Sequence, residues 1–186
     1  MIKFYILVVG DEVLDGLVKD TNSLYLQEKI QSTGNTVLEI RKVRDESKAI
    51  SNAVLDFLES NADILVCFGG LGPTYDDQTK QAIASSLNKN LVYYEEAKKT
   101  VLDYFKKSPY AKADEQQFYY PEGSKLIANP NGTAMGMAIE VKGKTIIALP
   151  GPPKENKPMI ESLISKYFLK DKKYQKTFLV TGMEES

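Results

Sequence analysis

The sequence contains no histidine and a single cysteine, and its apolar runs are short. The absence of histidine excludes Ser-His-Asp and Cys-His catalysis, histidine-ligated zinc and imidazole acid–base chemistry. Cys67 cannot form an intrachain disulfide on its own, which fits a reducing, cytoplasmic compartment. The longest apolar runs, Ile6–Val9 and Ile64–Phe68, are too short to cross a bilayer, and we expect no secretory signal because no basic segment precedes them.

The 186 residues have the composition of an ordinary globular domain. A hydrophobic content of 42% and a charged content of 26% exclude disordered and collagen-like chains. Lysine and arginine number 24 against 25 acidic residues, which gives a net charge of -1. We therefore expect neither a nucleic acid nor a membrane as a partner.

Three strand–loop–helix units in the first half predict an α/β fold with a parallel sheet. The first and third expected strands are short apolar runs and the second alternates in polarity, and each expected helix begins with residues that favour an N-terminus. The expected strands are Lys3–Val9, Thr36–Val43 and Asp63–Phe68, and the expected helices begin at Asp20-Thr21-Asn22-Ser23, Asp45-Glu46-Ser47 and Thr79.

The second half predicts a less regular continuation of the same fold. An amphipathic helix is expected at Glu95–Lys107, with Ala97, Val101, Leu102 and Phe105 on its inward face. The further expected elements are strands at Lys125–Ala128, Gly136–Val141 and Thr145–Leu149, a helix at Glu155–Leu169, a charged linker at Lys170–Lys176 and the start of another strand at Thr177–Val180.

Four loops at the expected carboxyl ends of the strands carry most of the candidate chemistry. They are Gly10–Ser23, Arg44–Ser47, Gly69–Gln78 and Pro150–Glu155. Their glycines let backbone N–H groups approach a ligand, and phosphate oxygens favour such donors. Several carboxylates lie in the same loops and would repel a phosphate unless a divalent cation lay between them. These loops therefore predict a metal–phosphate site.

Several of the residues singled out by the sequence also have a purely structural interpretation. Asp76-Asp77 and Asp45-Glu46-Ser47 precede helices and are typical N-caps, which does not exclude metal binding. Cys67 lies in an apolar run and is expected in the core, where burial raises the pKa of a thiol. The lysine- and tyrosine-rich stretch 166–176 is expected to be a solvated helix end and not an RNA-binding strip. The string Gly70–Tyr75 lacks the third glycine of a dinucleotide fingerprint, and no P-loop string occurs.

Four ordered motifs resemble the competence/damage-inducible protein A (CinA) family. Gly10–Gly16 with Asp20–Ser23 is similar to the opening signature of that family, and Gly69–Thr79 is close to its GGLGPTxDDxT motif. Asn129–Gly136 resembles its NPxGTAPG string, with methionine where the second proline is usual, and Ala148–Glu155 resembles its LPGxPxE loop. The four motifs together make the resemblance more specific than any single glycine string.

The resemblance implies the molybdopterin-binding (MoaB/Mog-like) fold, a three-layer α/β/α domain with a mostly parallel sheet. It implies one such domain over residues 1–170, with 171–186 as a linker and the start of a truncated following segment or a tail. It also implies catalytic roles for Asp45 and Asp77 and metal binding by Asp76 and Asp77. The residues expected to bind phosphate or nucleotide are Gly10, Glu12, Asn22, Gly69, Gly70, Gly72, Thr74, Pro150 and Gly151.

Members of this subtype are linked to ADP-ribose pyrophosphatase activity with divalent cations. The resemblance therefore implies Mg, Mn or Co as a cofactor, with a monovalent cation as a further candidate. A nucleotide or pterin phosphate is the expected ligand, and a homo-oligomer, either a dimer or a trimer, is the expected assembly. The nicotinamide-mononucleotide deamidase domain of many bacterial members has no counterpart in this sequence, so deamidase activity is not expected.

Three functional hypotheses remain. The first is a metal-dependent pyrophosphatase that acts on ADP-ribose or a similar diphosphate, with a carboxylate such as Glu12 or Asp45 as the general base. The second is a molybdopterin- or nucleotide-binding protein of molybdenum cofactor biosynthesis. Leu71 and Asp76 disfavour it, because those proteins usually carry threonine and a phosphate-pairing arginine there. The third is a non-catalytic ligand-binding module.

Overall fold

The computed structural model describes residues 1–105 and 115–169, and its centre is a six-stranded sheet with the strand order β2-β1-β3-β8-β7-β6. Its strands are β1 (Lys3–Val9), β2 (Thr36–Val43), β3 (Ile64–Phe68), β6 (Lys125–Ile127), β7 (Gly136–Val141) and β8 (Lys144–Leu149). β2, β1, β3 and β8 pair in parallel, whereas β7 and β6 are antiparallel to their neighbours. The predicted α/β fold with a mostly parallel sheet is confirmed.

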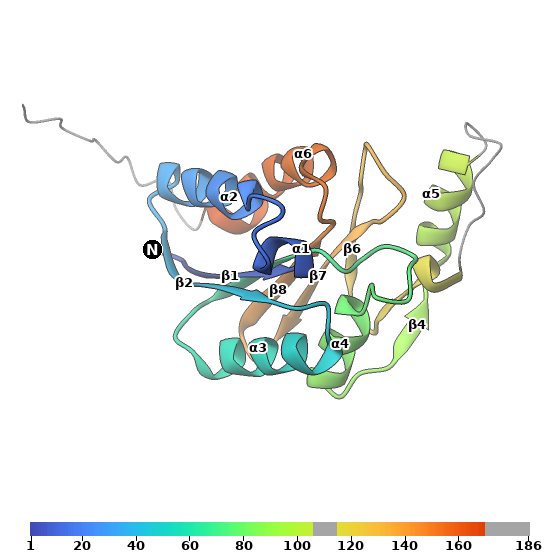
Figure 1. Ribbon diagram of the computed structural model, residues 1–186, viewed down its shortest axis with the longest axis horizontal. Helices are drawn as coiled ribbons and strands as arrows, with labels where there is room; N and C mark the ends of the chain where they lie inside the picture. Colours follow the sequence, from blue (N-terminus) through green and yellow to red (C-terminus); the bar gives the residue numbers. More distant parts are fainter. Residues whose placement is uncertain (106–114, 170–186) are drawn as a thin grey trace, which may run out of the picture.

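Helices cover both faces of the sheet and give the molecule three layers (Figure 1). α2 (Thr21–Ser32) and α6 (Pro153–Leu163) lie on one face, and α3 (Ser47–Glu59) and α4 (Thr79–Ser86) lie on the other. A π-helical turn, η2 (Ile164–Phe168), continues α6. Asp20 caps α2 as expected, because its carboxylate accepts the Ser23 N–H at 3.0 Å.

The core is divided by the sheet into two apolar clusters. Alternate side chains of β1 enter each cluster, and Phe4 packs with α2 and α6 while Leu7 packs with α3 and α4. Burial of one such large apolar side chain contributes about 1.5–3 kcal/mol. Cys67 of β3 is fully buried as predicted, and burial raises the pKa of its thiol to about 12.

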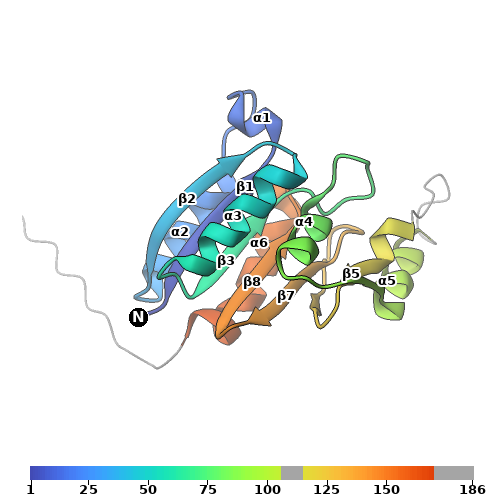
Figure 2. The same cartoon turned by 90° about the horizontal axis from the view of Figure 1, so that it is seen from below.

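A smaller unit lies beside α4, at the end of the molecule that carries α5 (Figures 1 and 2). It consists of β4 (Leu91–Tyr93), α5 (Glu95–Phe105), η1 (Glu115–Phe118) and β5 (Tyr119–Pro121). β4 and β5 form a two-stranded antiparallel sheet that the sequence did not predict. The expected inward position of Leu102 is wrong: its side chain is 40% exposed, whereas Ala97 and Val101 are buried. The reason is that the buried stripe of α5 is narrower than the apolar spacing indicates.

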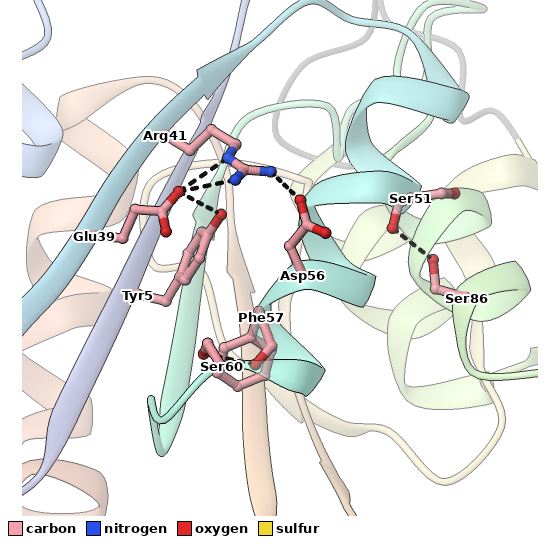
Figure 3. Close-up of polar contacts among 8 residues, drawn as sticks. All are labelled: Tyr5, Glu39, Arg41, Ser51, Asp56, Phe57, Ser60 and Ser86. Carbon is pink, nitrogen blue, oxygen red and sulfur yellow. Dashed lines mark hydrogen bonds and ion pairs between the residues drawn. The ribbon is translucent and has the colours of Figure 1, made fainter.

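A polar cluster joins the outer strand β2 to α3 (Figure 3). Glu39 accepts hydrogen bonds from the Tyr5 hydroxyl and from Arg41, each at 3.0 Å, and Arg41 also pairs with Asp56 of α3. Burial raises the pKa of Tyr5, and the hydrogen bond to Glu39 raises it further. The cluster therefore holds β2 and α3 together beside the core.

Several predicted segments lie outside the described residues. They are Lys106-Lys107 of the predicted helix, the linker Lys170–Lys176 and the strand start Thr177–Val180. Within residues 1–105 and 115–169, no helix combines the length and the apolar character that a membrane crossing requires.

Candidate functional site

The loops that follow β1, β2, β3 and β8 meet at one edge of the sheet, where they surround a cleft of about 380 Å³. β1 leads directly into the short helix α1 (Asp11–Leu14), which lies beyond the strand ends in Figure 2. The cleft is the position expected for a ligand of an open parallel sheet. The predicted site residues that line it are Glu12, Asp45, Gly69, Gly70, Gly72, Asp76, Asp77, Pro150 and Gly151.

A second pocket of about 260 Å³ adjoins this cleft. Val9, Glu12, Gly151 and Pro152 line both of them. Asn22, the predicted residue in α2, lines the smaller pocket. The two pockets together form a crevice along the ends of the strands.

Two glycines after β3 adopt backbone conformations that other residues rarely adopt. Gly69 has a φ of 99° and Gly70 a φ of 65°. A Cβ atom on Gly69 would lie 2.3 Å from the Val9 carbonyl oxygen, and one on Gly70 would lie 2.3 Å from Thr79 Oγ1. Glycine is therefore required here by the packing of the loop against β1 and α4, before any ligand is considered.

Asp77 shapes the loop between β3 and α4. Its carboxylate accepts the Thr74 N–H at 2.9 Å and a hydrogen bond from the Thr74 hydroxyl, and it lies directly against Gly72. The N-cap interpretation of Asp76-Asp77 is wrong, because Gln78 occupies the N-cap position of α4. The Asp77 carboxylate is instead engaged within the turn by the N–H and the hydroxyl of Thr74.

Asp45 is half-buried at the rim of the cleft, where its carboxylate accepts the Asp11 N–H at 2.9 Å. The N-cap position predicted within Asp45-Glu46-Ser47 is confirmed, because Glu46 is the N-cap residue of α3, but the Glu46 side chain makes no capping hydrogen bond. The Ser47 N–H at the start of α3 donates to the Gln78 side chain at 3.1 Å. Burial raises the pKa of Asp45, and the negative charges of Glu12, Asp11 and Asp76 add to the increase, although the Asp11 N–H opposes it. Negative charge is therefore crowded at this rim.

The other metal candidate, Asp76, is exposed, and hydrogen bonding with Thr74 and its own backbone lowers its pKa. Within the described part of the chain, no three or more acidic, cysteine or histidine side chains form a group that could hold a metal ion. Magnesium is often bound by one or two carboxylates together with phosphate oxygens of a substrate. The described rim therefore offers no complete protein cage for a metal ion, and its carboxylates could hold a cation only together with the oxygens of a ligand.

The predicted residues Asn22, Gly10 and Thr74 lie around the cleft without lining it. The Asn22 side-chain amide donates to the Gly151 carbonyl at 2.8 Å, and the Asn156 amide donates to the same carbonyl at 3.1 Å. Gly10 lies beneath Glu12, where a Cβ atom would be 3.0 Å from a carboxylate oxygen. These residues position the loops, and Thr74 does so through Asp77.

Thr133 and Ala134, which the sequence analysis missed, also line the cleft, as does Glu155, which lies in the predicted loop Pro150–Glu155 but was not named as a site residue. Glu155 Oε2 accepts a hydrogen bond from Asn129 at 2.7 Å, so two segments distant in the sequence meet here. The two segments are the motifs Asn129–Gly136 and Ala148–Glu155, which carried the family resemblance. Membership of these motifs was the signal by which the sequence could have indicated their residues as part of the site.

The fold and the cleft define a class of protein. The family described as "Probable molybdopterin binding domain" matches residues 5–170 of the chain. The solved structure of CinA from Thermoplasma acidophilum is 31% identical with a TM-score of 0.80, and the match covers 88% of this chain and 96% of that one. The chain belongs to the molybdopterin-binding domain family and, within it, to the CinA type, which confirms the predicted family.

Longer relatives and more distant structures agree with this assignment. Competence-damage inducible proteins of Bacillus mycoides and Bacillus thuringiensis (strain Al Hakam) are 39% and 42% identical over 97% and 87% of this chain. The chain spans 45% and 40% of their respective lengths. The tungsten cofactor synthesizing protein MoaB from Pyrococcus furiosus shares the fold, with a TM-score of 0.61 at 19% identity over 90% of this chain and 93% of that one.

Proposed function

We propose that the protein is a metal-dependent pyrophosphatase that hydrolyses ADP-ribose or a similar diphosphate-linked nucleotide. The observation that carries the proposal is the convergence of glycine-rich backbone and crowded carboxylates in one cleft. A diphosphate accepts hydrogen bonds from backbone N–H groups, and its charge is compatible with nearby carboxylates only when a cation is shared between them.

The glycine loop, residues 69–72 after β3, is the proposed binding surface for the diphosphate. Gly70, Gly72 and Gly151 line the cleft, and the absence of side chains there leaves backbone groups accessible to phosphate oxygens. Gly69 and Gly151 approach closely, since a Cβ atom on Gly151 would lie 3.7 Å from the Gly69 Cα. The loops after β3 and β8 therefore present one continuous surface to a ligand.

Two carboxylates at the rim are the proposed cation ligands. Asp76 and Asp77 line the cleft, and their oxygens are the donors that Mg, Mn or Co accept in such sites. A bound divalent cation would offset the phosphate charge and lower the pKa of a water molecule. Asp77 combines this position with its contact to Thr74, so its replacement would disturb both the loop and the cleft.

Asp45 is the proposed general base. The chain has no histidine, so the proton of an attacking water must pass to a carboxylate or another weak base. A raised pKa brings a carboxylate closer to the working pH, and burial beside Glu12 and Asp76 raises the pKa of Asp45. Glu12 is the alternative base because it lines both pockets.

The experiment is an assay of ADP-ribose turnover with Mg, Mn or Co, scored by released AMP. We expect Asp45→Asn to lower the turnover number by about 100-fold or more, as loss of a general base does, and Asp77→Asn to abolish hydrolysis with the fold intact. Glu59→Gln, which removes an exposed carboxylate at the end of α3, is the matched control and should leave turnover unchanged. Absence of AMP with all three cations, or full activity of Asp45→Asn, would contradict the proposal.

Two outcomes separate the alternatives. Binding of ADP-ribose without turnover would indicate a ligand-binding module, and a rise in melting temperature with a pterin phosphate alone would favour a molybdopterin-binding role. The expected dimer or trimer stays a prediction, which light scattering on the purified chain tests.

A further inference from the structure

Part of the cleft is built from residues other than the glycines and carboxylates to which the proposed function gives a role. Thr133 and Ala134 come from the segment between β6 and β7, and Glu155 comes from the first turn of α6. The proposed hydrolysis assigns no role to these side chains. Their packing shows that they are held in fixed positions.

Asn129 holds Glu155 in place. The buried Asn129 amide donates to Glu155 Oε2 at 2.7 Å and to the Ala134 carbonyl at 2.9 Å, and its oxygen accepts the Asn131 N–H at 3.0 Å. Glu155 also rests directly on Gly132, where a Cβ atom would lie 2.4 Å from Oε2. The carboxylate is thus fixed against backbone, with no room for a larger residue beneath it.

Gln117 holds Thr133 in a similar way. Its side chain is 1% exposed, and its Nε2 donates to Thr133 Oγ1 at 2.8 Å. A hydroxyl whose oxygen accepts a hydrogen bond retains its own hydrogen for donation. Gln117 Oε1 has no partner among residues 1–105 and 115–169, and a buried unpaired oxygen costs about 1–3 kcal/mol. The fold retains this contact despite that cost.

The chemistry of Glu155 determines what it can recognise. A carboxylate repels phosphate oxygens, which carry charge of the same sign, and it accepts hydrogen bonds from hydroxyl groups. The Asn129 amide engages Oε2, which leaves the lone pairs of Oε1 for a ligand. The same cleft contains the glycine loop, so a hydroxyl that reaches Glu155 would belong to the group attached to the diphosphate. An Asp or Glu side chain plays this part in dinucleotide-binding folds, where it accepts a hydrogen bond from a ribose hydroxyl.

Building on the proposed function, we propose that Glu155 is a specificity-determining residue that accepts hydrogen bonds from the hydroxyl pair of a ribose attached to the bound diphosphate. The site would then select diphosphates that carry an intact ribose over those whose sugar lacks these hydroxyls. Asn129 is the positioning residue that sets the orientation of Glu155.

The test uses two ligands that differ only in these hydroxyls and that the protein does not cleave. They are adenosine 5′-(α,β-methylene)diphosphate and its 2′,3′-dideoxy counterpart, titrated calorimetrically with Mg²⁺ present. We expect the wild-type chain to bind the ribose compound about 10- to 100-fold more tightly, which corresponds to charged hydrogen bonds to a carboxylate. Glu155→Ala should lose this preference and bind both ligands within about threefold of the wild-type affinity for the dideoxy compound.

Two further variants keep the test interpretable. Glu155→Gln retains the shape of the side chain, and it should lower the preference by about threefold or more even if Glu155→Ala folds poorly. Glu161→Ala is the matched control, because it also removes a carboxylate from α6. The Glu161 carboxylate pairs with Lys29 and does not line the cleft. It should leave the preference unchanged.

The outcomes separate this inference from the proposed function. Equal wild-type affinities for the two ligands would overturn the role of Glu155 and leave the diphosphate site standing. Equal weakening of both ligands by Glu155→Ala would also overturn it, because the effect would not depend on the hydroxyls. Failure of the wild-type chain to bind either ligand at millimolar concentration would overturn the inference and the proposed function together.

Discussion

Replacement of Gly69 by alanine tests how tightly the β3 loop packs against the end of β1. Gly69 combines a φ of 99° with a Cβ position only 2.3 Å from the Val9 carbonyl oxygen. Gly143 is a matched control, because its φ is 76° and nothing lies within 4 Å of its Cβ position. Both substitutions place alanine at a positive φ, and only the first also forces two backbone segments apart.

The expected loss of stability follows from the positive φ and from the close contact of the added Cβ atom. Alanine in the left-handed region costs about 1–2 kcal/mol, and this term applies to both variants. At Gly69 the 2.3 Å separation must open to an ordinary contact of at least 3.4 Å, and such overpacking costs about 1–3 kcal/mol more. The gain from a stiffer unfolded chain is the same in the two variants and cancels in their difference. Gly69→Ala should therefore be less stable than Gly143→Ala by about 1–3 kcal/mol.

Urea denaturation followed by circular dichroism measures this difference. The dependence of the unfolding free energy on urea should be equal in the two variants, so that the midpoints report stability alone. A melting temperature lower by about 2–4 °C per kcal/mol is expected for a domain of this size. Equal destabilisation by the two substitutions would refute the reasoning, because it would mean that the loop moves away from Val9 without resistance.

Other substitutions test the remaining contacts. Lys144→Met should lower the unfolding free energy by about 2 kcal/mol in urea titrations, since the ammonium donates to the Phe57, Ser60 and Ala62 carbonyls at the end of α3. Lys142→Met, at the neighbouring exposed turn, should change it little. Asp45→Asn should be more stable than the wild-type chain at pH 7 and equal to it below pH 3.8, because a raised folded-state pKa gives stability that is lost as the pH rises. Thermal unfolding measures the difference in stability between Asp45→Asn and the wild-type chain. If this difference does not grow as the pH rises from below 3.8 to 7, burial and the neighbouring carboxylates do not raise the pKa of Asp45.

The sequence predicted the central sheet well because β1 and β3 are nearly continuous apolar runs and β2 alternates between apolar and polar residues. The bounds of β2 agree with the prediction, and those of β3 differ by one residue. β4 and β5 were missed because three residues are too few to show an alternating pattern. α1 was missed for a similar reason, since four residues span little more than one helical turn and cannot show a repeating apolar spacing.

The meeting of the acidic and glycine-rich loops was predictable, because the carboxyl ends of parallel strands share one edge of a sheet. The partners of individual side chains were not predictable. Asn22 binds the Gly151 carbonyl 129 positions away, and no local pattern indicates such a contact. The contacts of the aspartates at the two predicted helix starts were unpredictable for the same reason, since Asp45 accepts the distant Asp11 N–H and Asp77 accepts the Thr74 N–H within its turn.

The hydrogen bond between Gln78 and the start of α3 links the loop after β3 to the helix that follows β2. The Ser47 N–H is satisfied by a side chain that lies next to Asp77 in the chain, 31 positions from Ser47 itself. Any rearrangement of that loop on ligand capture would release this amide to solvent or protect it further. Proton exchange at Ser47 would thus follow events in the cleft from a distance, and a spectroscopist could observe occupancy there without labelling a residue of the cleft.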